Sequence, residues 1–276
     1  MDPTTLNKIF QFEPGDEMET IQTISKRMIS KFSSLGRCHG VHRVFDDFVT
    51  LAAYEINCID LPRKEQRSAQ LMQIRSKYSP LELTEMAHIL GDLALALSIE
   101  PHDVLGNVFS EMSLTNGHLG QVFTPQSLAD AVAMLQIGAG LDDTISKNGF
   151  VTVMDPACGA GAMPIAFAKA LAEKGYNYQQ QVHMTLVDID SRAVFMAYIQ
   201  LTLLGIPATV VHGNSLSLKE YDHLHTPFHF IGNWDFKLRA NKDQKLIELQ
   251  DHQKCCTFTT DEPLDEHMSS SCAMTT

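Results

Sequence analysis

Two carboxylates, each at the end of an apolar run, are the residues of this chain best suited to holding a small polar ligand. Asp155 opens a short glycine turn, and Asp188 ends an alternating apolar run. Gly159 and Gly161 in the turn lack a Cβ and can adopt positive φ, so a ligand can approach the main chain closely. Doubly wound sheets bind nucleoside cofactors with this order of strand, acidic residue, glycine turn and helix.

The dinucleotide fingerprint differs from this turn in two respects. Only two glycines occur between 155 and 161, and Pro156 follows the carboxylate directly. A bound pyrophosphate needs more glycine-rich backbone than this. The turn therefore favours a nucleoside ligand without a pyrophosphate.

The segments around these residues predict alternating strands and helices. We expect strands at 151–155, 182–187 and 208–212, a helix over 191–204 capped by Asp190, and a fourth strand at 227–231. Short connections in this order imply a parallel sheet with right-handed crossovers, which brings the carboxyl ends of the strands to one edge. The predicted fold class is α/β, with a Rossmann-like domain.

Two motifs resemble a known family. The seven residues from Asp155 are similar to Asp-Pro-Ala-Cys-Gly-Ser-Gly, the first motif of the S-adenosylmethionine-dependent, adenine-specific DNA methyltransferases, with Ala160 replacing the serine. Gly120-Gln-Val-Phe-Thr-Pro125 resembles the Gly-Gln-Phe-Phe-Thr-Pro motif in modification subunits of type I restriction-modification systems. Taken alone, this second segment predicts an ordinary helix start with Thr124 as N-cap.

The resemblance implies a Rossmann-like methyltransferase domain that binds S-adenosyl-L-methionine and acts on the exocyclic amino group of adenine in DNA. Asp188 would accept hydrogen bonds from the ribose hydroxyls, and Asn214, where the family usually has Asp, would present its carbonyl oxygen to the adenine. The expected cofactor contacts are Phe123, Thr124, Pro125, Asp155, Pro156, Ala157, Cys158, Gly159, Gly161, Asp188, Ile189 and Asn214.

The catalytic motif of this family is missing. Family members end the fourth strand with Asn-Pro-Pro and an aromatic residue, which hold the target amino group and stack on the flipped base. No Asn-Pro-Pro occurs in this sequence, so Asn233 and Trp234 are the candidate contracted site. The alternative is that Trp234 is a core aromatic residue. Two functions stay open: a DNA adenine methyltransferase, and a catalytically degenerate methyltransferase-like binding or regulatory protein.

Composition and spacing give the expected domains. Apolar residues at helical spacing fill the first part of the chain, Ser79 and Glu82 form a capping-box pattern, and Asp103 begins a last short helix. We expect a helical domain at 1–118, an S-adenosylmethionine-binding domain at 119–240, and a short helix with a flexible tail at 241–276. A parallel sheet truncated after four strands would expose an apolar edge, which predicts a homodimer or a specificity or partner subunit.

The formal charge of −12 is unfavourable for approach to phosphate, so a DNA partner follows from the resemblance alone. No long apolar span or basic leader is evident, which predicts a cytoplasmic protein without membrane partners. Cys38, His39 and His42 are neighbours without a second ligand pair, so a plain loop is favoured there over the alternative of a structural zinc, and no metal site is expected.

Overall fold

The computed structural model describes residues 19–57, 64–112, 124–138 and 140–244. Its chain divides into one compact unit from Met1 to Trp234 and a second unit from Asp235 onward, of which residues 235–244 are described and helical. Among the helices in these ranges, none is both long enough and apolar enough to cross a membrane. The features below belong to the first unit.

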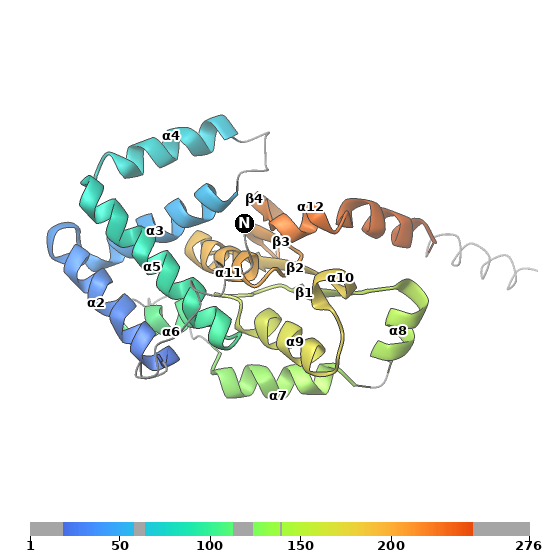
Figure 1. Ribbon diagram of the computed structural model, residues 1–276. Coiled ribbons are helices and arrows are strands. Elements are labelled where there is room, and N and C mark those ends of the chain that lie inside the picture. The colour runs from blue at the N-terminus through green and yellow to red at the C-terminus, as the bar shows by residue number, and fades with distance from the viewer. Residues whose placement is uncertain (1–18, 58–63, 113–123, 139, 245–276) are drawn as a thin grey trace, which may run out of the picture. The chain divides into compact units, whose positions relative to one another are not determined.

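A four-stranded sheet with the order β1-β2-β3-β4 forms the centre of the first unit (Figure 1). β1 (Val151–Asp155), β2 (Val182–Asp188) and β3 (Ala208–Asn214) are parallel, which confirms the predicted strands and the α/β fold class. Asp155 pairs with Leu186 and Asp188 with His212. The parallel register thus gathers the carboxyl ends of β1, β2 and β3 at one edge.

The prediction of a fourth strand at 227–231 was wrong. This stretch forms α12 (Pro227–Ile231), which has proline in its first turn, and the fourth strand is the preceding β4 (Lys219–His225), antiparallel to β3. Proline lacks the N–H that a sheet ladder needs and favours the start of a helix. In β4 only Leu224 is buried, so this strand had no apolar run to reveal it.

The outer edge of β4 accepts a hydrogen bond from a side chain of the helical bundle. Arg67, a buried residue of α4 (Lys64–Arg75), donates through Nη2 to the main-chain oxygen of His223 at 3.0 Å and to Asp222 at 3.2 Å. The side chains of Lys219 and Glu220 are exposed on the same strand. Charged residues and side-chain bonds of this kind keep an edge strand from pairing further.

The crossover helices bury apolar residues beside the sheet. α9 (Ala162–Glu173) follows β1, and α10 (Tyr178–Gln181) precedes β2. α11 (Ser191–Leu203) joins β2 to β3 and packs on both strands and on α3 (Val41–Ile56). Asp190 caps α11, as predicted, by accepting from the Arg192 N–H at 2.9 Å. α8 (Leu141–Asn148) precedes β1 and contacts it.

α7 (Gln126–Gln136) begins differently from the prediction. Its cap residue is Pro125 and no side chain bonds to the cap, so the assignment of Thr124 as N-cap was wrong. The helix packs against α9 and buries Ala129 and Ala133, while Leu135 is 82% exposed. Small residues let these two helices approach closely.

The remaining helices form a bundle at one side of the sheet (Figure 1). They are α2 (Ile21–His39), α3 (Val41–Ile56), α4, α5 (Pro80–Ile99) and α6 (Val104–Glu111). The ring of Phe32 lies 5.2 Å from those of Phe45 and Phe48, and the expected capping box of Ser79 and Glu82 is present. Because α3 packs on α11, the bundle and the sheet share one apolar core.

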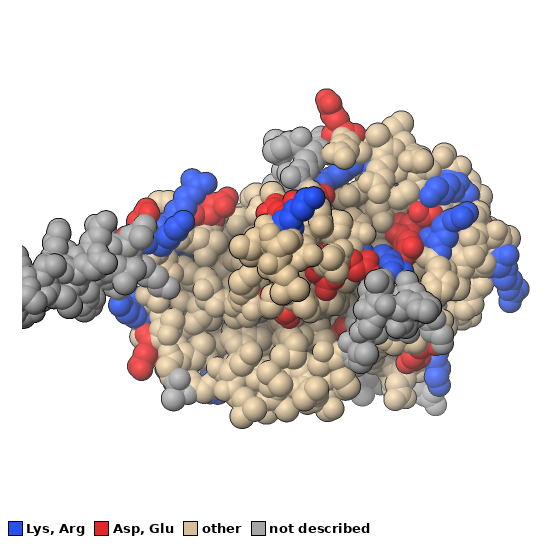
Figure 2. All heavy atoms as spheres, turned by 180° about the vertical axis from the view of Figure 1, so that it is seen from behind, with Lys and Arg blue, Asp and Glu red and all other residues tan. Residues whose placement is uncertain are grey.

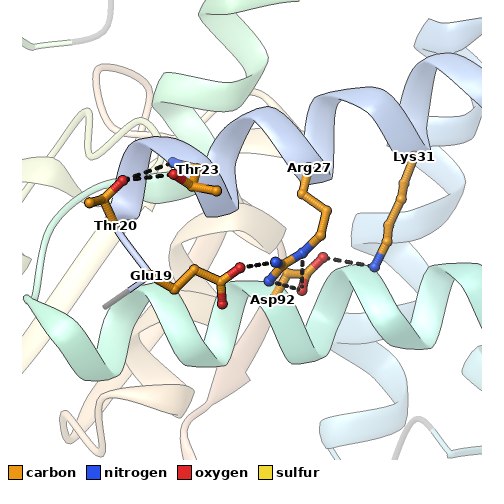
Figure 3. Close-up of polar contacts among 6 residues, drawn as sticks. All are labelled: Glu19, Thr20, Thr23, Arg27, Lys31 and Asp92. Atoms are coloured by element: carbon orange, nitrogen blue, oxygen red, sulfur yellow. Dashed lines mark hydrogen bonds and ion pairs between the residues drawn. The ribbon is translucent and has the colours of Figure 1, made fainter. Parts of the chain in front are cut away.

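A charged cluster joins α2 to α5 (Figure 3). Asp92 on α5 accepts from Arg27 Nε at 2.9 Å, from Arg27 Nη2 at 2.7 Å and from Lys31 Nζ at 2.9 Å, and Arg27 also pairs with Glu19. Burial raises the pKa of Asp92, but the hydrogen bonds from Arg27 and Lys31 outweigh it, so the net pKa lies below the ordinary value. The ionised carboxylate therefore helps to hold the two helices together.

Candidate functional site

A cavity of about 710 Å³ lies at the carboxyl ends of β1, β2 and β3. This volume falls within the range of small-molecule sites. Nine of the residues predicted from sequence line it: Thr124, Asp155, Pro156, Ala157, Cys158, Gly159, Asp188, Ile189 and Asn214. The chain thus brings the expected ligand contacts together from separate segments.

Three other predicted contacts do not line the cavity or cannot be placed. Pro125 and Gly161 are absent from its wall. Gly161 instead is the N-cap residue of α9 and has φ +100°. It packs against α11, where a Cβ on this residue would lie 3.2 Å from Leu201 Cδ1. Phe123 lies outside the described residues.

The turn after β1 presents its main chain to the cavity. Gly159 has φ +54°, a conformation that side chains disfavour. The Cys158 N–H donates to Val187 O at 3.0 Å, and the Gly159 N–H donates to Asp188 Oδ2 at 2.9 Å. These bonds tie the glycine turn of β1 to the end of β2, so the sheet fixes both.

Asp155 and Asp188 retain capacity to accept hydrogen bonds. Asp155 Oδ1 accepts from the Ala157 N–H at 3.0 Å, and Asp188 Oδ1 accepts from the Asp190 N–H at 2.9 Å. An ionised carboxylate has about four acceptor sites, so sites remain on both residues. Burial raises the pKa of Asp155 despite the Ala157 bond, and the nearby Asp188 raises it further.

The cavity wall is acidic. Arg192 lines it but is committed to Asp190 at 3.1 Å and to Asp46 at 3.6 Å. In the part of the chain that the structure describes, no Lys or Arg forms an ion pair with Asp103, Asp155 or Asp188. Carboxylates without a cation favour a positively charged ligand.

Asn214 lines the cavity as predicted but presents a different group. Its Oδ1 accepts from the N–H groups of Leu216 and Ser217, both at 3.0 Å, and so closes the turn between β3 and β4. A carbonyl oxygen with two bonds is fully used, which leaves the amide NH₂ as the group that a base could contact.

Sequence reasoning missed Asp103 and Gln200. Asp103 lines the cavity from the start of α6, about fifty residues before the glycine turn, and its capping pattern gave no link to that turn. Gln200, fully buried on α11, accepts from the Val104 and Leu105 N–H groups at 2.8 and 3.0 Å and donates to Asp103 Oδ1 and Ala160 O at 2.9 Å each. A glutamine within an apolar helix was the available signal.

Asn233 and Trp234 are not brought to the cavity. The buried indole of Trp234 packs 5.1 Å from the Phe150 ring and 5.3 Å from that of His183, counted between centroids. Phe150 precedes β1 and His183 is the second residue of β2, so the indole lies at the amino ends of the strands. A strand of five residues spans about 16 Å, which separates this position from the cavity. Trp234 serves as a core aromatic residue here.

The described residues offer little that resembles a metal centre or a nucleic-acid track. Among them no three His, Cys, Asp or Glu side chains are grouped to hold a metal ion. On the face shown in Figure 2, Lys and Arg are interspersed with Asp and Glu and form no continuous basic stripe. Phosphate-binding surfaces usually gather their cations.

Comparison with known proteins places this cavity in a family context. Residues 102–260 match the model of the family described as N-6 DNA methylase. A solved structure from Listeria monocytogenes, assigned as a class I S-adenosylmethionine-dependent methyltransferase, is 20% identical with a TM-score of 0.40, over 71% of this chain and 54% of that chain. The chain thus spans about half the length of that structure. No curated protein matches.

Proposed function

The chain belongs to the N-6 DNA methylase family, and from this premise we propose that its cavity binds S-adenosyl-L-methionine for methyl transfer to the exocyclic amino group of adenine in DNA. The observation that carries the proposal is the convergence of the Asp155 turn, Asp188 and Asn214 on one cavity. Three consecutive parallel strands contribute these residues, as nucleoside sites in α/β sheets require.

The residues present fit such a ligand. The Gly159 main chain has no side chain to obstruct a ligand, and the cavity volume suits a molecule of this size. S-adenosylmethionine supplies an activated methyl group on a cationic sulfonium. The acidic wall, with Asp155 and Asp188 lacking a cationic partner among the described residues, complements that positive charge.

Each residue has a proposed part in binding. Asp188 accepts hydrogen bonds from the ribose hydroxyls with its unused acceptor sites. The Asn214 NH₂ donates to a ring nitrogen of the adenine, and Ile189 and Leu216, which are 62% and 96% exposed on the cavity wall, cover the base when it is bound. Burying these two side chains adds apolar contact to the site.

The acceptor half of the reaction needs groups other than Asn233 and Trp234. Trp234 is packed at the opposite end of the strands, and the sequence lacks the Asn-Pro-Pro motif. This observation favours a second candidate function, a cofactor-binding member of the family that does not transfer methyl groups by itself. A partner or second copy that covers β1, which is a border strand of the described sheet and has Met154 65% exposed, would complete the enzyme.

Two measurements test the proposal. Calorimetry of the full chain with S-adenosylmethionine should give saturable binding, and Asp188→Ala should weaken it by about 1–3 kcal/mol because the ribose donors lose their acceptor. Tritiated methyl transfer to unmethylated DNA then separates the candidates. Binding with transfer supports the enzyme, binding without transfer supports the second candidate, and absence of binding refutes both.

A further inference from the structure

Asp103 is a buried carboxylate on the cavity wall with one oxygen uncommitted. The residue is 3% exposed and lines the cavity. Its Oδ1 accepts from the Gly106 N–H at 2.8 Å and from Gln200 Nε2 at 2.9 Å. Among the described residues no donor reaches Oδ2. Oδ2 thus has acceptor capacity left, and the residue that carries it forms part of the cavity wall.

Capping of α6 does not require this charge. Asn caps a helix as well as Asp does, and both bonds to Asp103 go to the single oxygen that Asn also has. Burying an ionised carboxylate is costly unless a charge or several donors compensate it. Burial is the largest effect on Asp103 and raises its pKa, against the bonds from Gln200 and Gly106. A carboxylate in this position therefore points to a cationic partner.

The fold places Asp103 at one end of the cavity. Gln200 donates both to Asp103 and to Ala160 O, so the carboxylate lies beside the turn that links β1 to α9. Asn214 lies at the end of β3, two strands away in the order β1-β2-β3. A nucleoside held between β2 and β3 would direct its 5′ substituent toward β1 and Asp103.

This inference rests on the proposed function and deepens it. We propose that Asp103 Oδ2 accepts the ammonium group of the amino-acid part of the ligand, so that the cavity selects adenosyl ligands that carry this amine. An ammonium offers three donors, and its bond to a carboxylate is charge-assisted. The titratable group that acts on Asp103 is His102, whose Nδ1 bonds to Glu100 O at 2.8 Å, and no Lys or Arg of the described residues pairs with this carboxylate.

Calorimetry of the full chain with two ligands tests the assignment. The first is S-adenosylhomocysteine, and the second is its deaminated analogue, which keeps the nucleoside, the thioether and the carboxylate. Asp103→Asn should weaken S-adenosylhomocysteine about 10- to 100-fold, the range for one hydrogen bond to a charged group, and leave the analogue unchanged or tighter. Asp188→Asn is the matched control and should weaken both ligands alike.

The remaining outcomes each decide a point. Equal weakening of both ligands by Asp103→Asn, or no effect on either, would overturn the assignment while the proposed function stands. Failure of the wild-type protein to bind either ligand would overturn the assignment and the proposed function together. Asp103→Ser, which keeps a capping oxygen without the charge, must reproduce the selective loss; circular dichroism checks that both variants are folded.

Discussion

Gln200 donates to Asp103 across 97 positions of sequence, at 2.9 Å, and the same amide group bonds to Ala160 O. Its carbonyl oxygen accepts from two N–H groups at the start of α6. One side chain thus joins α6, α11 and the glycine turn through four hydrogen bonds. Two residues of this cluster, Asp103 and Ala160, line the cavity.

Removing the Gln200 amide should destabilise the protein strongly. Gln200→Ala leaves the Leu105 N–H and Ala160 O buried without partners, while the Val104 N–H keeps only His102 O at 3.0 Å, and each unpartnered group costs about 1–3 kcal/mol. We expect a loss of about 3 kcal/mol or more in the free energy of unfolding, measured by urea denaturation. Gln73→Ala, at an exposed position of α4, is the control and should change stability by less than about 0.5 kcal/mol.

Two glycine substitutions should have opposite effects. A Cβ on Gly106 would lie 2.0 Å from Asp103 Oδ2, so Gly106→Ala must displace the carboxylate and should lower both thermal stability and ligand affinity. Gly91 lies in α5, where an added Cβ would meet no neighbouring atom within 4 Å, so Gly91→Ala should stabilise by about 0.5–1 kcal/mol. Stabilisation by Gly106→Ala in a melting experiment would contradict the packing of Asp103 over this glycine.

Asp103 should make the ligand-free protein less stable as pH rises. Its folded pKa lies above the unfolded value, so its contribution is most favourable below the unfolded pKa and is lost as pH rises through the folded pKa. Asp103→Asn should therefore raise the melting temperature at neutral pH, and this gain should shrink in acid. A constant gain at every pH would show that ionisation is not its cause.

Asp92 should show the reverse dependence on pH. Its folded pKa is lowered, so its contribution is present above the unfolded pKa and is lost as pH falls through the folded value. Asp92→Asn should therefore destabilise the protein at neutral pH by weakening the bonds to Arg27 and Lys31, and have less effect in acid. Melting curves of the Asp92 and Asp103 variants over one pH series test both signs together.

Substitutions of Trp234 and Asn233 should leave the ligand affinity unchanged, because neither residue lines the cavity. Trp234→Phe removes part of a fully buried ring that packs on Phe150, so it should lower the melting temperature without changing the affinity for S-adenosylmethionine. Asn233→Ala, at an exposed residue with φ +51°, should leave the affinity unchanged. A loss of affinity in either variant without a loss of stability would show that the residue contacts the ligand.

The sequence revealed those parts of the fold that have strong local signals. Apolar runs ending in Asp155 and Asp188 located β1 and β2, and the cap at Asp190 located α11. β4 escaped because its residues are mostly polar and it is stabilised by pairing with β3, a nonlocal contact. The predicted cavity residues could be found because each belongs to a short local motif at a strand end or helix start.

Asp103 and Gln200 could not be placed from sequence because the contact between them is nonlocal. Their contact joins segments almost a hundred residues apart, and only the packing of α6 beside α11 creates it. Trp234 is the reverse case. A local pattern made it a candidate site residue, but its ring packs at the amino ends of the strands, whereas the cavity lies at their carboxyl ends. The direction in which a strand runs through the sheet depends on the whole fold and cannot be inferred from a local pattern of residues.

The two border strands of the described sheet, β4 and β1, differ in how readily a further strand could pair with them. On one border, Arg67 occupies the main-chain oxygen of His223 and charged side chains stand beside it, which closes that border to another strand. On the other border, β1 pairs with β2 alone among the described strands. Among the described strands, β1 is therefore the border at which a further strand could pair, and β1 ends in Asp155 of the cavity.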